Sequence, residues 1–147
     1  MYLVSACLAG INCRYDGGNT ENETIKKMVK EGKAIAVCPE QLAKLPIPRA
    51  CCEIIIDDDG NKKVMSTDGK DFTEEYKKGA VKTLEICRTR DISEAILQSR
   101  SPSCGYGLIY DGTFSGKRIK GEGLTAELLT KNNIRIFTES DIDKFQE

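Results

Sequence analysis

Seven cysteines and the lack of any histidine define the chemistry open to this chain of 147 residues. Without histidine, Ser–His and Cys–His catalysis and every zinc site with an imidazole ligand are excluded. A chain of this length can bury a hydrophobic core without disulfide staples, and an odd number of cysteines cannot all pair within it. We therefore treat the cysteines as candidates for metal binding or catalysis.

Three of the cysteines each come after a short apolar run of the kind that forms a buried strand. In chain order they are Cys7 after residues 2–6, Cys38 after residues 34–37 and Cys104 after residues 94–98. Ligands of open parallel sheets bind beyond the carboxyl ends of the strands, so cysteines at three such ends can meet although they are far apart in sequence. The alternative is that each is a small apolar residue of the core. We expect one shared metal site.

The thiols by themselves leave the metal open. Structural zinc takes four closed ligands, and Cys13, Cys51 or Cys52 could supply the fourth. A [4Fe–4S] cluster normally uses four cysteines, so a cluster held by three keeps one iron open as a Lewis acid. An open, thiophilic iron favours a substrate that carries sulfur.

The elements that must position these cysteines alternate between strands and helices. The expected strands are 2–6, 34–37, 94–98 and 134–137, and the expected helices are 21–31, 71–90, 125–131 and 141–147. Two β-prone runs, 53–56 and 63–66, flank turn residues and predict a hairpin. In the glycine-rich segment 105–123, residues 116–123 form either a flap over the site or a solvated hairpin. The order predicts an α/β fold, a compact single-domain Rossmann-like three-layer sandwich over residues 1–147 with a mainly parallel sheet and a hairpin insert.

The composition fits a soluble globular protein without a broad nucleic-acid-binding surface. The formal net charge is −1, and 39% of the residues are apolar. No apolar run approaches the roughly 18 residues that cross a bilayer, and no basic region precedes the apolar start at residues 1–8, so we expect no signal peptide. The expected location is the cytoplasm. The expected partner is a small molecule rather than a nucleic acid or a membrane, with the oligomeric state left open.

Six short motifs follow one another in an order that resembles one known family. They are Ser5-Ala6-Cys7-Leu8, Arg14-Tyr15-Asp16-Gly17, Val37-Cys38-Pro39-Glu40, Leu45-Pro46-Ile47-Pro48-Arg49, Ser101-Pro102-Ser103-Cys104-Gly105 and Tyr110-Asp111-Gly112-Thr113-Phe114. Over nearly its whole length the chain resembles the thiouracil desulfidase family, formerly a domain-of-unknown-function family. The resemblance implies an enzyme with a [4Fe–4S] cluster on Cys7, Cys38 and Cys104. It also implies a non-redox desulfuration of a thiolated nucleobase or nucleotide, in which the open iron binds the substrate sulfur and C=S becomes C=O with release of sulfide.

The resemblance further implies two catalytic residues, Glu40 and Ser101, and their positions suggest how they act. Glu40 lies two residues beyond Cys38 and can take a proton from the attacking water. Its structural alternative is an acid that complements the dipole of a helix beginning there. Ser101 lies three residues before Cys104 and can relay a proton or hold the substrate, or else serve the turn around Pro102.

Three more polar residues are candidates for substrate binding. Arg49 follows two prolines and can bind a carbonyl or phosphate group, while Arg14 and Ser103 lie in loops beside expected ligands. The alternative for each is a structural, surface or turn role. The sequence departs from the family pattern at Cys51 and Cys52, where a proline often follows Pro-Arg-x, so the pocket wall is expected to differ there.

Two other functions remain open at the level of sequence. The first is a non-catalytic module that binds zinc or a cluster. The second is a sulfur carrier that forms a persulfide on Cys13, Cys51 or Cys52. The desulfidase differs from the first by its open coordination position beside a carboxylate.

Overall fold

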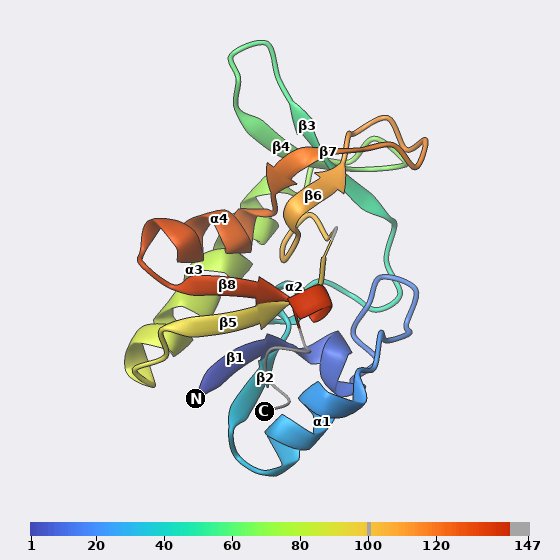
Figure 1. The fold of residues 1–147 in the computed structure, drawn as a ribbon. Coiled ribbons are helices and arrows are strands. Elements are labelled where there is room, and N and C mark those ends of the chain that lie inside the picture. Colours follow the sequence, from blue (N-terminus) through green and yellow to red (C-terminus); the bar gives the residue numbers. More distant parts are fainter. Residues whose placement is uncertain (100, 142–147) are drawn as a thin grey trace.

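The computed structural model describes residues 1–99 and 101–141, and its centre is a sheet of four parallel strands (Figure 1). The strands are β1 (Tyr2–Ser5), β2 (Ala34–Val37), β5 (Glu94–Leu97) and β8 (Arg135–Thr138), in the order β2-β1-β5-β8. From β1 the chain passes to β2 on one side and then to β5 on the other. This change of direction makes the carboxyl ends of β1 and β5 the point at which an open sheet binds its ligands.

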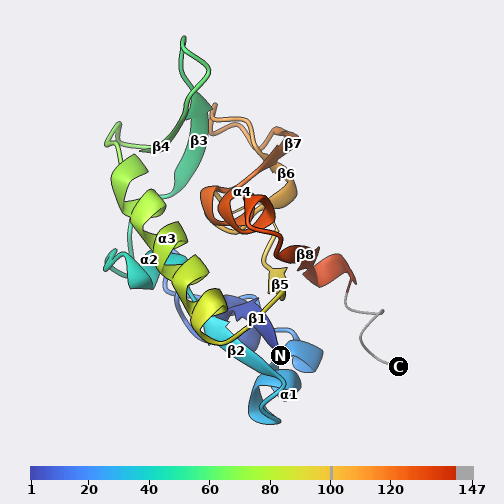
Figure 2. The same ribbon diagram turned by 90° about the vertical axis from the view of Figure 1, so that its left-hand side faces the viewer.

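Helices cover both faces of this sheet, as Figure 2 shows. Helix α1 (Glu23–Lys30) lies on one face, and α3 (Thr73–Thr89) and α4 (Leu124–Lys131) lie on the other. The pleat of the strands explains the division, because successive side chains point to opposite faces. In β1, Leu3 packs in the cluster under α3 and α4, and Val4 packs in the cluster under α1. The predicted three-layer α/β architecture with a mainly parallel sheet is confirmed.

Two antiparallel hairpins extend from the sheet-and-helix body (Figure 1). The predicted hairpin consists of β3 (Cys52–Ile56) and β4 (Lys62–Ser66), whose turn is held by Asp57 through hydrogen bonds from the amides of Asp59 and Asn61. The glycine-rich segment forms the second, β6 (Tyr106–Tyr110) and β7 (Arg118–Glu122). Residues 118–120 are exposed, as expected of a solvated hairpin.

Two short helices follow β1 and β2, and of these only a helix beginning at Glu40 was anticipated, as the structural alternative for that residue. They are the 3-10 helix η1 (Ala6–Ala9) and the helix α2 (Pro39–Leu42). Helix α2 packs tightly on α3 at Gly79, where an added Cβ would lie 2.2 Å from the carbonyl oxygen of Pro39. The glycine thus sets how closely α2 approaches the body of the protein.

The helix predicted for residues 141–147 lies, apart from its first residue, outside the described part of the chain. Among the described helices, none combines the length and the apolar character that a bilayer span requires.

Candidate active site

The carboxyl ends of β1 and β2 and the loop after β5 surround one pocket, with a cavity of about 130 Å³. A cavity of this size has room for several water molecules, more than a single metal ion needs. Six of the seven cysteines line it, whereas Cys87 of α3 is buried in the core. The six are Cys7, Cys13, Cys38, Cys51, Cys52 and Cys104.

Cys7 and Cys38 are held at the ends of their strands by the two short helices. Cys7 lies in η1. Cys38 is the N-cap of α2, and the nearby backbone amides of Gln41 and Glu40 contribute to lowering the pKa of its thiol. Cys13 hydrogen-bonds to both thiols, which lowers the pKa of Cys7 and Cys38 and raises the pKa of Cys13 itself. Cys13 carries one S–H proton and can donate to one of the two at a time, so this contact biases one thiol toward the thiolate form, which is the form that binds metals.

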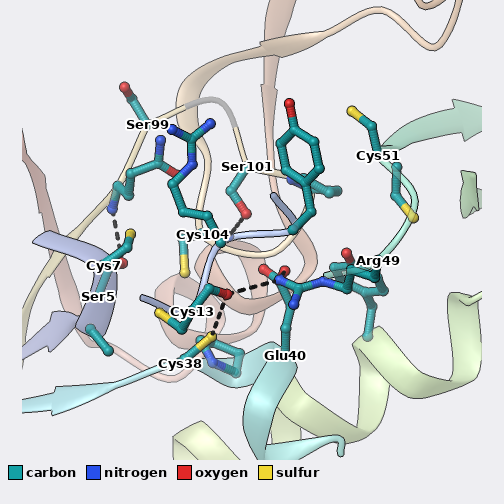
Figure 3. Close-up of a pocket in the computed structure, with 18 of the residues that line it drawn as sticks. Ser5, Cys7, Cys13, Cys38, Glu40, Arg49, Cys51, Ser99, Ser101 and Cys104 are labelled. Atoms are coloured by element: carbon teal, nitrogen blue, oxygen red, sulfur yellow. Dashed lines mark hydrogen bonds and ion pairs between the residues drawn. The ribbon is translucent and has the colours of Figure 1, made fainter. Parts of the chain in front are cut away.

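Cys104 reaches the same pocket from the loop that follows β5. Burial raises the pKa of its thiol, and a hydrogen bond with Ser5 at the end of β1 acts in the opposite direction. Coordination to a cation deprotonates a thiol, so a bound metal would offset the effect of burial. Figure 3 shows Cys104 gathered with Cys7, Cys13 and Cys38 on one side of the pocket, with Cys51 on the other.

Glu40 extends from α2 into this pocket and forms an ion pair with Arg49. The two side chains are 13% and 6% exposed, so the pair is largely shielded from water. Burial lowers the pKa of Arg49, but the charge and the hydrogen bond of Glu40 outweigh burial and raise it. The guanidinium therefore keeps its charge, and the pair places a fixed cation and a carboxylate beside the cysteines (Figure 3).

Ser101 lines the pocket and also stabilises the loop that carries Cys104. Its Oγ accepts hydrogen bonds from the backbone N–H groups of Ser103 at 3.0 Å and of Cys104 at 3.2 Å. A hydroxyl has two acceptor lone pairs and one proton, so these two bonds leave the proton for another acceptor. The turn role expected as the alternative for Ser101 is therefore compatible with a role toward a ligand.

Of the remaining two candidates for substrate binding, the structure places one at the pocket and the other in the core. Arg14 lines the pocket, with its guanidinium 5.7 Å from the ring centroid of Tyr15. Ser103 does not line it: the side chain is fully buried, and its hydroxyl lies 2.7 Å from that of Thr125 in α4. The structure thus brings Arg14 and Arg49 to the site and places Ser103 in the core.

Sequence reasoning missed some residues of the pocket, including Ser5 and Tyr76. Ser5 ends β1, so the strand-end argument that identified Cys7 also applies to it. Tyr76 lies on the buried face of α3 and hydrogen-bonds to Cys52, whose pKa burial raises to about 11. A tyrosine at a core position of a helix carries no sign in the sequence that its hydroxyl reaches a pocket.

Comparison with known proteins places the chain in one family. The sequence pattern that defines the 2-thiouracil desulfurases matches residues 2–141. The chain belongs to the 2-thiouracil desulfurase family. It is 45% identical to the uncharacterized protein YbbK of Bacillus subtilis (strain 168) over 148 residues, covering 97% of this chain and 98% of that protein. Its structure is similar to that of the [4Fe-4S]-dependent thiouracil desulfidase TudS, with a TM-score of 0.88, 37% sequence identity, and coverage of 97% of this chain and 93% of that one.

The cysteine thiols in this 2-thiouracil desulfurase pocket are of the ligand type that iron–sulfur clusters use. Thiolates are the usual ligands of such clusters, and Cys7, Cys38 and Cys104 share one pocket. Among the described residues, no group of three or more Cys, His, Asp and Glu side chains is placed to hold one metal ion. The thiolates around a cubane cluster bind separate irons, so they need not converge on a single point.

Proposed function

We propose that this protein is a [4Fe–4S]-dependent desulfidase that replaces the C=S group of a thiolated uracil, free or as its nucleotide, by C=O. The observation that carries the proposal is that Cys7, Cys38 and Cys104 share a pocket with Glu40 and Ser101, in a chain of the 2-thiouracil desulfurase family. The reaction is balanced without a reductant or oxidant: the thiocarbonyl compound and water give the carbonyl compound and hydrogen sulfide.

Cys7, Cys38 and Cys104 are the residues that would hold the cluster. When bound by three thiolates, a cubane cluster supplies an open, thiophilic iron that polarises a C–S bond. Cys13 lies against Cys7 and Cys38 but belongs to the loop before α1. We assign it no ligand role.

Glu40 is the residue assigned to water activation. Its side chain is 13% exposed, lies in the pocket and follows Cys38 by two residues, so it reaches the space next to the proposed cluster. Water must lose a proton as it attacks the ring carbon, and a carboxylate placed there can accept it. Ser101 supports the same step, because its free proton can be donated to a substrate atom.

Anaerobic reconstitution followed by an assay for sulfide and uracil tests this proposal, with 2-thiouracil, 4-thiouracil and 4-thiouridine monophosphate as substrates. Wild-type protein should bind the cluster, with its visible absorbance, and release one sulfide for each carbonyl product. Glu40→Gln should keep the absorbance and lose about 10²–10⁴ in kcat, the usual contribution of general acid–base catalysis. Full turnover by Glu40→Gln would overturn its assignment as the base.

Variants of the cysteines distinguish the desulfidase from the two other functions. Cys7→Ser, Cys38→Ser and Cys104→Ser should each lose the cluster absorbance, whereas the control Cys87→Ala should keep it because Cys87 lies in the core. Colourless protein with one zinc per chain would support the non-catalytic module. Loss of turnover in Cys51→Ser with the cluster intact would support the sulfur carrier.

A further inference from the structure

Arg49 is held by an ion pair and by hydrogen bonds to several parts of the protein. Its side chain is 6% exposed and forms the ion pair with Glu40. Nη2 also donates to the carbonyl oxygen of Cys13 at 3.2 Å, and Nη1 donates to that of Pro46 at 3.2 Å. The backbone N–H of Arg49 donates to the carbonyl oxygen of Tyr15 at 2.7 Å.

These contacts join three separate segments that build the pocket. Glu40 belongs to α2, Cys13 and Tyr15 belong to the loop before α1, and Pro46 belongs to the loop that carries Arg49. The Cys13 carbonyl oxygen also lies 3.9 Å from the sulfur of Cys38. One guanidinium therefore fixes the Glu40 carboxylate relative to the loop that borders the proposed ligands.

We propose that Arg49 is a positioning residue that acts through Glu40 and does not contact the substrate. This inference rests on the proposed function, in which Glu40 activates water. A carboxylate in a shielded site is stable as an anion only when it is paired and hydrogen-bonded. A planar guanidinium meets this need with a fixed geometry, whereas a lysine ammonium is a point charge on a flexible stem.

One donor group of the Arg49 guanidinium bears on whether this residue also binds the substrate. The Nε–H group of Arg49 is buried and has no hydrogen-bond partner among the described residues. A substrate carbonyl at this donor would make Arg49 a binding residue, as the sequence suggested. The two roles differ in kinetics, because a positioning residue affects kcat and a ground-state binding contact affects KM.

Arg49→Lys in the reconstituted enzyme tests the inference. The lysine keeps the positive charge but lacks the planar guanidinium with its fixed geometry. We therefore expect kcat to fall about 10–100-fold, as for a slightly misplaced catalytic group. KM should stay within about twofold and the cluster absorbance should be unchanged. The matched control is Arg88→Lys, because Arg88 is exposed on α3 and hydrogen-bonds to Asn132 outside the pocket. This control should leave kcat and KM unchanged.

A double-mutant cycle with Glu40→Gln separates positioning from a general structural role. If Arg49 acts through Glu40, adding Arg49→Lys to Glu40→Gln should cost less than about twofold more in kcat. Where Glu40→Gln is too slow for steady-state assay, single-turnover measurement with excess enzyme supplies the rate. A raised KM, or losses that multiply in the double variant, would overturn the inference. A wild-type enzyme that releases no sulfide would instead overturn the proposed function.

Discussion

At the scale of single residues, two serines of one loop illustrate what sequence can and cannot reveal. Ser101 and Ser103 flank the same proline and precede Cys104, so their surroundings in the sequence are nearly equivalent. The structure places Ser101 at the pocket and Ser103 against Thr125 of α4. The partner of Ser103 is supplied by a helix that follows an entire hairpin, and no local spacing contains that information.

The ion pair of Glu40 with Arg49 likewise shows which parts of the site the sequence can predict and which it cannot. Cys7, Cys38 and Glu40 could be predicted to lie near one another because strand ends share one edge of a parallel sheet. The pairing of Glu40 with Arg49 could not, because Arg49 reaches it by a loop whose path depends on contacts with Cys13 and Tyr15.

The two serines give matched variants that should fail in different ways. Ser101→Ala removes a hydroxyl from the pocket and the two hydrogen bonds that this hydroxyl accepts in the Cys104 loop, so it should lower kcat for sulfide release by more than about tenfold and also lower the free energy of unfolding. Ser103→Ala leaves the buried hydroxyl of Thr125 without its partner and should cost about 1–3 kcal/mol of stability. Its kcat should stay within about twofold of wild type. Denaturant unfolding and steady-state kinetics on both variants check this, and a kcat that falls as far in Ser103→Ala as in Ser101→Ala would contradict it.

At the scale of elements, the periodic segments were predictable and the short connecting ones were not. The central strands and the helices α1, α3 and α4 were each expected within a few residues of their observed bounds, because their apolar patterns follow the period of a strand or a helix. Helix α2 spans only Pro39–Leu42, too short for a period to show. The second hairpin lies in a glycine-rich stretch, where both the flap and the hairpin fit the composition.

Gly79 allows a prediction about how α2 is placed. In an exposed helix, Gly→Ala stabilises by about 1 kcal/mol. At Gly79 the new Cβ would lie 2.2 Å from the Pro39 carbonyl oxygen, a backbone atom that cannot move alone. Gly79→Ala should therefore destabilise by about 1–3 kcal/mol, as overpacking does.

Because α2 carries Glu40, the same substitution should also lower kcat. The control is Lys78→Ala, at an exposed neighbouring position of α3 that makes no such close approach. Chemical denaturation and turnover assays of the two variants measure both effects. A Gly79→Ala protein that is more stable than wild type would show that α2 is free to shift.

At the scale of the whole molecule, the proposed ligands join parts of the fold that the hydrophobic cores stabilise separately. Cys7 packs in the cluster on the α1 face of the sheet, and Cys104 packs in the cluster on the α3 and α4 face. Cys38 follows β2 at the edge of the sheet. A group bound to all three thiolates would link both faces and the sheet edge in the folded state, and the unfolded chain cannot present such a site.

Cluster removal should therefore lower the stability of the whole protein. A ligand that binds only the native state, at a free concentration about 100 times its Kd, adds about 2.7 kcal/mol to the free energy of unfolding. For a chain of this size that corresponds to a Tm higher by roughly 6–12 °C. Thermal unfolding without oxygen should show this difference between reconstituted and cluster-free wild type.

Cys87→Ala should keep the difference although its own Tm is lower, because it loses core packing and no ligand. Cys104→Ser should lose the difference, because its unfolding would no longer depend on reconstitution. Equal Tm values for the two wild-type forms would mean that the cluster does not link these parts of the fold.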